Sequence, residues 1–174
     1  FLTLVGGITT ASNGEIVING KNITSMSEKE LAKFRLENIG FVFQAYNLIP
    51  EMTAYQNIIL PLKLAHKKID KKYLSDICNK LSISDRLSHL PSELSGGQQQ
   101  RVAIARALIT KPSILLCDES TGNLDKKSSE DVLDLLTQLC ADNGCTLILV
   151  THDKSVADRM GRIITISDGE ISED

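Results

Sequence analysis

Aromatic residues are scarce in this 174-residue chain: tryptophan is absent, and phenylalanine and tyrosine supply only 4% of the residues. So few rings argue against a platform on which nucleic-acid bases stack. The formal net charge of −3 also lacks the basic excess that a nucleic-acid-binding face usually needs. We therefore expect no nucleic acid among the partners of this protein.

Long apolar runs and metal-type cysteine pairs are also missing. No apolar run approaches the roughly 18 residues required to span a bilayer. The four cysteines (Cys78, Cys117, Cys140 and Cys145) form no C-x-x-C spacing, so we interpret them as reduced thiols of a cytosolic protein. The 42% of hydrophobic residues suffices for one domain with a substantial core.

One apolar run, Ile114 to Cys117, ends in two acidic residues, Asp118 and Glu119. Such a run is typical of a parallel strand that is covered on both faces. The carboxyl end of a strand is where α/β sheets hold ligands and do chemistry. A solvated strand end is the alternative, but two acids directly after buried residues favour a functional role.

A second stretch, Ser95-Gly96-Gly97-Gln98, is a glycine-rich turn that opens a helix. Backbone N–H groups at a helix start can receive phosphate oxygens. Ser95 and Gln98 also have the spacing of a capping box, so the pair could serve only to start the helix. One helix start can fulfil both roles.

Five motifs together resemble those of ATP-binding cassette (ABC) ATPases, and they occur in that family's order. Leu94 to Arg101 resembles the signature motif, and Ile114 to Glu119 resembles the Walker B strand with its catalytic glutamate. Gly122 to Asp125 resembles the D-loop, and Val150 to Asp153 the switch-histidine loop. Gln44 resembles the Q-loop glutamine. One short motif is weak, but five in order are specific.

The resemblance implies an ATPase that converts ATP and water to ADP and phosphate, with ATP and Mg²⁺ bound. The stretch Asn47 to Pro50 is most similar to the branch that serves lipoprotein release, macrolide export and peptide export. The resemblance further implies a homodimer, or a paired ABC subunit, that works with transmembrane permease subunits. We expect a cytoplasmic protein that is peripheral at the inner face of the cell membrane through its permease partner.

The resemblance also assigns roles at the hydrolytic centre. Asp118 would hold Mg²⁺ through water, and Glu119 would polarise the attacking water. His152 would contact the γ-phosphate, although a histidine after a strand is often structural. Gln44 would reach Mg²⁺ and the attacking water and couple the nucleotide to the helical subdomain, although it could simply end a strand.

Other matching residues point to a second subunit. In the family, the surface formed by Ser95, Gly96, Gly97 and Gln98 engages ATP that the opposite subunit holds in a head-to-tail dimer. Asp125 would organise the dimer interface, or it could serve mainly as the N-cap of the following helix.

The phosphate-loop pattern G-x-x-x-x-G-K-[ST] occurs nowhere in the sequence, which departs from the family. The segment Phe1 to Val5 reads as the tail of a helix without a visible start. We therefore expect a truncated or incompletely recorded chain.

The expected fold class is α/β: a RecA-like P-loop NTPase core without its N-terminal part, an antiparallel β-subdomain and an α-helical subdomain. We treat residues 1–174 as one ABC ATPase domain, with 8–43 as the β-subdomain portion, 51–96 as the helical subdomain and 97–174 as the core portion. Residues 39–43 form a strand within the first portion. Pro61 is expected to kink or interrupt a helix, and 147–150 is expected to be a buried strand.

Two alternatives from other functional classes stay open. One is a soluble ABC ATPase of DNA repair or translation, against which the net negative charge and the lack of a basic stripe argue. The other is a non-catalytic fragment, which the absent phosphate loop favours and the acidic pair at 118–119 disfavours.

Overall fold

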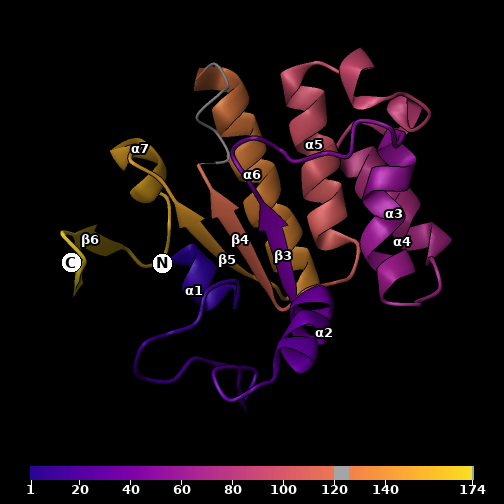
Figure 1. The fold of residues 1–174 in the computed structure, drawn as a ribbon. Helices are drawn as coiled ribbons and strands as arrows, with labels where there is room; N and C mark the ends of the chain where they lie inside the picture. The colour runs from indigo at the N-terminus through magenta and orange to yellow at the C-terminus, as the bar shows by residue number, and fades with distance from the viewer. Residues whose placement is uncertain (120–125, 174) are drawn as a thin grey trace.

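The computed structural model describes residues 1–119 and 126–173, and its core is a parallel sheet in the order β3-β4-β5 (Figure 1). β3 spans Ile39–Val42, β4 spans Ile114–Asp118 and β5 spans Thr146–Val150. Helix α5 (Gly96–Leu108) packs against β3, and α6 (Lys126–Asn143) packs against β5. This arrangement confirms the expected α/β class.

Helices α2 (Glu28–Asn38), α3 (Ala54–Leu64) and α5 begin at the capping boxes that the sequence predicts. In each, the cap oxygen of Ser27, Thr53 or Ser95 accepts the N–H three residues on, and the side chain of that residue bonds back to the cap N–H. The other described helices are α1 (Leu2–Val5), α4 (Lys71–Lys80), α7 (Lys154–Ala157) and the 3₁₀ turns η1 (Ser84–Arg86) and η2 (Pro91–Glu93).

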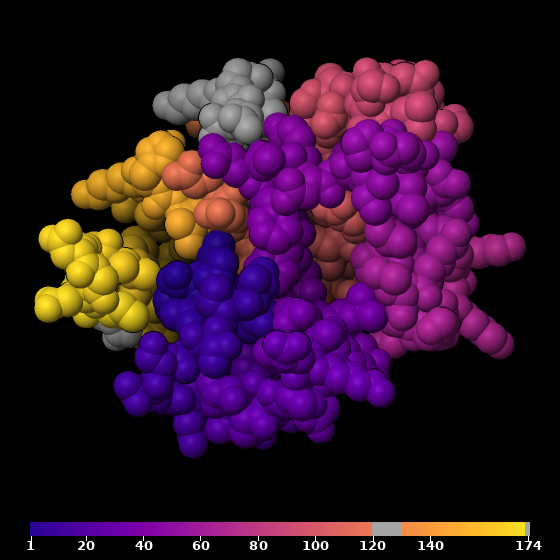
Figure 2. Space-filling model, viewed as in Figure 1, coloured from indigo at the N-terminus to yellow at the C-terminus, as the bar shows by residue number. Residues whose placement is uncertain are grey.

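Side chains of β4 alternate between two hydrophobic layers, one on each face of the sheet. Leu115 and Cys117 are buried in a layer that they share with α3, α4, α5 and α6. Leu116 is buried in a second layer with Leu2 of α1 and Phe34 of α2, and Figure 2 shows the N-terminal residues over this face. Because neighbouring residues of a strand point to opposite faces, β4 is covered on both sides, as its apolar run predicts.

Two short hairpins use the turns that their sequences favour. β1 (Val17–Ile18) pairs with β2 (Lys21–Asn22), and β6 (Ile164–Ser167) pairs with β7 (Glu170–Glu173), both antiparallel. The turn residues Asn19-Gly20 and Asp168-Gly169 all have positive φ, between 51° and 86°. A type I′ turn requires positive φ at both central positions, which Asn-Gly and Asp-Gly supply.

Three expectations differ from the structure. Pro61 lies inside α3, which continues to Leu64, so the expected interruption is wrong while the expected kink stays a prediction. The helix buries Ile58 and Leu62 on either side of this proline. The strand at 39–43 pairs in parallel with β4, so it belongs to the core sheet and not to an antiparallel β-subdomain. β5 is only half-buried, because it is an edge strand of the described sheet. The other subdomain boundaries stay predictions.

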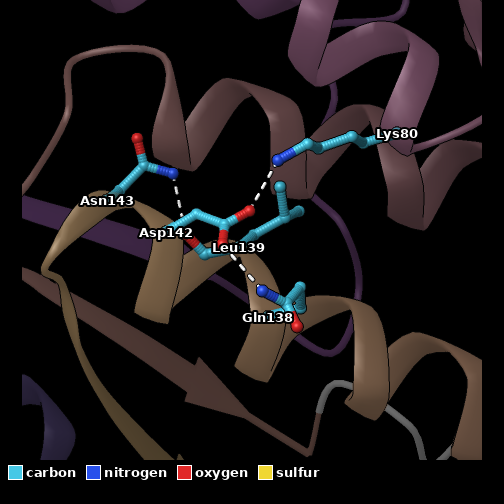
Figure 3. A network of polar contacts seen from close by, with 5 residues as sticks. All are labelled: Lys80, Gln138, Leu139, Asp142 and Asn143. Atoms are coloured by element: carbon cyan, nitrogen blue, oxygen red, sulfur yellow. Dashed lines mark hydrogen bonds and ion pairs between the residues drawn. The ribbon is translucent and has the colours of Figure 1, made fainter.

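A polar network joins α4 to α6 (Figure 3). Lys80 Nζ lies 2.6 Å from Asp142 Oδ2, and Gln138 Nε2 donates to Asp142 Oδ1 at 2.7 Å. On the same side of α4, the Tyr73 hydroxyl donates to the Leu108 carbonyl of α5 at 3.1 Å. The helical segment (residues 51–96) is therefore joined to the core by polar contacts as well as by the shared hydrophobic layer.

The four cysteines are buried free thiols, as interpreted from the sequence. Within residues 1–119 and 126–173, we find no helix with the length and apolar character that crossing a bilayer requires.

Candidate functional site

Three neighbouring strands deliver the predicted catalytic residues to one edge of the sheet. β3 and β4 run parallel and in register, and so do β4 and β5. Gln44 follows β3 by two residues, Glu119 directly follows β4, and His152 follows β5 by two residues. Because parallel strands end at the same edge, these residues gather there beside Asp118, the last residue of β4.

Glu119 and His152 are in direct contact. His152 Nδ1 lies 2.7 Å from Glu119 Oε1, and the Glu119 backbone N–H donates to the Val150 carbonyl at 3.0 Å. The Glu119 side chain is 31% exposed and that of His152 is 78% exposed. Glu119 has a φ of 40°, a conformation that non-glycine residues rarely adopt and that is often found at functional sites. The pair thus forms an acid–imidazole contact that is open to a ligand.

The loop that carries His152 is fixed by a helix cap. Asp153 Oδ1 accepts hydrogen bonds from the backbone N–H and the hydroxyl of Ser155, at 2.8 and 2.7 Å. These bonds hold the pKa of Asp153 below its usual value, and the nearby His152 lowers that pKa further. His152 is therefore held between the end of β5 and an ordered turn of α7.

Asp118 and Gln44 offer the type of ligand that Mg²⁺ prefers. Both side chains are exposed at the sheet edge, and both carry hard oxygen atoms. The described residues contain no group of three or more histidine, cysteine, aspartate or glutamate side chains placed to hold a metal ion. Mg²⁺ at nucleotide sites is usually bound by one or two protein ligands plus phosphates and waters, which this donor set fits.

Ser95 to Gln98 form an ordered turn at the start of α5. Ser95 Oγ accepts from the Gln98 N–H at 3.3 Å, and Gln98 Oε1 accepts from the Ser95 N–H at 2.9 Å. The Gln99 side chain also stabilises the turn, because its Nε2 donates to the carbonyls of Pro91 and Leu94. A Cβ added at Gly97 would meet no described atom within 4 Å. The space beside that glycine is therefore open.

The signature turn (Ser95 to Gln98) and the acid–imidazole pair are not hydrogen-bonded to each other among the described residues. α5 begins at the end of the molecule toward which β3 and β4 point (Figure 1), yet no hydrogen bond found among the described residues joins Ser95 or Gln98 to Glu119 or His152. Asp125 lies outside the described residues, so its role stays a prediction.

Three residues that sequence reasoning missed shape the loop after Gln44. The Tyr46 hydroxyl lies 3.7 Å from where a Cβ of Gly96 would stand. Arg106 of α5 and Asn57 of α3 donate to backbone carbonyls of this loop. The sequence offered a clue for Arg106 alone. It is a charged residue inside the apolar stretch Ala105 to Leu108 of a predicted helix, which suggests a specific polar partner.

A model of the family described as ABC transporter matches residues 1–122. The chain belongs to the ABC transporter family. It is an ATPase domain of that family, as the five motifs predict, and its fold is the family's RecA-like core with a β part and a helical part.

Relatives of this ABC transporter ATPase domain include proteins of the predicted branch. The chain is 46% identical over 158 residues to the ABC transporter ATP-binding protein YtrE of Bacillus subtilis, covering 90% of this chain and 68% of that protein. It is 42% identical over 173 residues to the lipoprotein-releasing system ATP-binding protein LolD of Francisella tularensis, covering 98% and 75%. It is 45% identical over 175 residues to the macrolide export ATP-binding/permease protein MacB of Bartonella quintana, covering 99% and 26%.

The ABC domain also matches solved structures of the ATP-binding cassette MJ0796. A dimeric post-hydrolysis state of that cassette bound to ADP and Pi superposes with a TM-score of 0.87 at 38% identity, over 99% of this chain and 78% of that one. A second dimeric structure of MJ0796 gives a TM-score of 0.86.

Proposed function

We propose that this ABC transporter domain hydrolyses ATP at a head-to-tail dimer interface, and that its movement drives transmembrane permease subunits. The observation that carries the proposal is the 2.7 Å contact between Glu119 Oε1 and His152 Nδ1 at the carboxyl edge of the sheet. It joins the two residues that the family resemblance assigns to the attacking water and the γ-phosphate.

Glu119 acts as the general base. An ionised carboxylate only accepts hydrogen bonds, so His152 donates through Nδ1 and orients the carboxylate. Glu119 then takes the proton of the attacking water as the new bond to Pγ forms and the bond from Pγ to the leaving oxygen of ADP breaks. The other ring nitrogen of His152, Nε2, is then available to contact the γ-phosphate.

Asp118 and Gln44 would hold Mg²⁺ at the same edge. When bound, the ion supplies positive charge that offsets the negative charge of the β- and γ-phosphates. Gln44 also leads into the loop toward α3, so it is placed to couple the site to the helical segment.

The open space beside Gly97 supports a shared site. Gly97 lies in helix α5, and no described atom outside that helix comes close enough to an added Cβ to require a glycine. We infer that the missing side chain makes room for the phosphate of ATP held by a second subunit, with Ser95, Gly96 and Gln98 beside it and Asp125 at the same interface. That the structural neighbour MJ0796 was solved as a dimer supports this assignment.

The proposed partners are a second copy, or a paired ABC subunit, and a membrane permease. LolD is the ATP-binding protein of a lipoprotein-releasing system, and MacB is a macrolide export ATP-binding/permease protein. We propose a peripheral location at the inner face of the membrane, reached through the permease.

The test is Glu119→Gln in the full-length gene product. Loss of a positioned general base should lower ATP turnover by roughly 100-fold or more, since such groups contribute about 10²- to 10⁴-fold. ATP binding should persist, and light scattering should show a dimer with Mg-ATP. Glu170→Gln, an exposed change in the C-terminal hairpin, is the matched control.

Undiminished turnover in Glu119→Gln would contradict the catalytic role. A monomer at saturating Mg-ATP would contradict the shared site. Stimulation of turnover by DNA or ribosomes, and not by membranes that contain the permease, would replace the transport proposal with the soluble alternative.

A further inference from the structure

The loop after Gln44 has an unusual backbone. Tyr46 and Asn47 are consecutive non-glycine residues in the left-handed region, with φ of 58° and 47°. Most side chains disfavour that region, although asparagine tolerates it, so the conformation of Tyr46 persists only where the surroundings hold it. Two backbone hydrogen bonds within the loop help to hold it, from the Tyr46 N–H to the Phe43 carbonyl at 3.0 Å and from the Asn47 N–H to the Ala45 carbonyl at 2.6 Å. Contacts from outside the loop hold it further.

Arg106 supplies those contacts from α5. Its Nη2 donates to the Tyr46 carbonyl at 2.7 Å, and its Nη1 donates to the Asn47 carbonyl at 2.6 Å. The two bonds use the planar fork of one guanidinium on adjacent carbonyls, a geometry that lysine cannot reproduce. Burial of this guanidinium lowers the pKa of Arg106.

The same helix meets the loop at a second point. α5 begins at Gly96, and the Tyr46 hydroxyl lies against that first turn. The Arg106 side chain holds the loop ten residues further along the helix. The far end of the loop is anchored separately, because the buried Asn57 of α3 bonds both backbone groups of Ile49 and the carbonyl of Met52.

We propose that Arg106 is a positioning residue that fixes the loop after Gln44 to α5, so that Gln44 and the signature turn keep one relative placement. The functional part of this inference rests on the proposed ATPase role of Gln44. The structural part, that Arg106 holds the left-handed pair, stands without it.

The experiment compares Arg106→Met and Arg106→Lys in the full-length gene product by amide hydrogen exchange and ATPase kinetics. Exchange in residues 45–49 should rise at least about 10-fold in Arg106→Met, because the local opening is no longer opposed. The kcat should fall at least about 10-fold while KM for ATP changes less than about 3-fold, because misplacement affects the reacting geometry more than binding. Arg106→Lys should restore neither value fully.

Arg35→Met is the matched control. Arg35 lines the same cavity of about 430 Å³ as Arg106, and its Nη1 also donates to a backbone carbonyl, that of Gly7, at 2.6 Å. Its loss should leave exchange at 45–49 unchanged.

Each outcome decides one part of the proposal. Unchanged hydrogen exchange at residues 45–49 in Arg106→Met overturns the proposal that Arg106 fixes the loop. Raised exchange with an intact kcat overturns the positioning role. If the unmodified protein has no ATPase activity, the proposed function fails. The hydrogen-exchange data still test whether Arg106 fixes the loop. If Arg106→Met does not fold, Arg106→Lys carries both measurements, and unchanged exchange and kcat in that variant overturn the proposal.

Discussion

Gly97 is a residue whose identity is not explained by the packing of residues 1–119 and 126–173. It has a helical conformation, and an added Cβ would stand in open space among the described residues. Alanine is the better helix former, so a fold-only constraint would favour it over glycine at this position. We infer that the constraint comes from a ligand that approaches the turn from outside.

Gly97→Ala should therefore separate stability from activity. The free energy of unfolding should stay the same or rise by up to about 1 kcal/mol, because alanine is the better helix former. ATP turnover should fall at least about 10-fold, because the new methyl group would displace the phosphate that we propose the turn receives. Chemical denaturation and steady-state ATPase assays measure the two effects, and full activity in this variant would count against the shared site.

At the scale of single elements, β3 and α5 approach each other closely at Gly40. A Cβ on Gly40 would stand 2.5 Å from the Ala107 carbonyl oxygen and 2.9 Å from Leu115 Cδ1. The oxygen belongs to the backbone of α5, so the overlap can be relieved only by moving the helix away from the strand. β3 leads into the loop of Gln44, and α5 carries Arg106, so this contact also sets the distance between those two residues.

Gly40→Ala should destabilise the fold by roughly 1–3 kcal/mol, the usual cost of an overpacked core. Urea denaturation measures the loss. Gly161→Ala, at a position where an added Cβ meets no described atom within 4 Å, is the matched control and should leave stability nearly unchanged. Equal stability of the two variants would show that α5 and β3 are not tightly packed at this point.

Elements with local causes were predictable from the sequence, and those with distant causes were not. The capping box of Ser27 and Glu30 lies within one helical turn, and the Asn19-Gly20 turn needs only its own residues. The parallel pairing of β3 could not be read from 39–43 alone, because the partner strand lies beyond the whole helical segment.

The site was predictable to the same extent. Motif order identified Glu119 and His152, and the register of parallel strands accounts for their contact. The contact of Arg106 with the loop was not predictable, because it depends on left-handed backbone at Tyr46, which the tyrosine residue type does not favour.

At the scale of the whole molecule, the helical segment and the core are joined by the ion pair of Lys80 and Asp142. The Lys80 hydrogen bond, followed by that of Gln138, holds the pKa of Asp142 below its ordinary value of 3.8. A carboxyl group with a lowered folded-state pKa stabilises the fold above its unfolded pKa. That contribution is lost as the pH falls through the folded-state pKa.

Asp142→Asn should therefore lower the unfolding midpoint slightly at neutral pH, by the small amount typical of exposed ion pairs. The gap between variant and wild type should stay constant down to the ordinary pKa of 3.8 and narrow below it. Denaturation curves across this pH range measure the gap. Asp76→Asn, an exposed change on α4, is the matched control, and a gap independent of pH would contradict the role of the Asp142 charge.

The order of the strands also governs how the chain reaches its native state. Ile39 pairs with Ile114, so two neighbouring strands of the sheet are separated by α3, α4 and α5 in the sequence. During synthesis, β3 leaves the ribosome long before its partner, while the capped helices between them can form from local contacts. Pairing over such a separation carries a loop-closure entropy cost and slows folding. The newly made chain therefore carries an unpaired apolar strand until β4 emerges, and in that interval it is most exposed to aggregation.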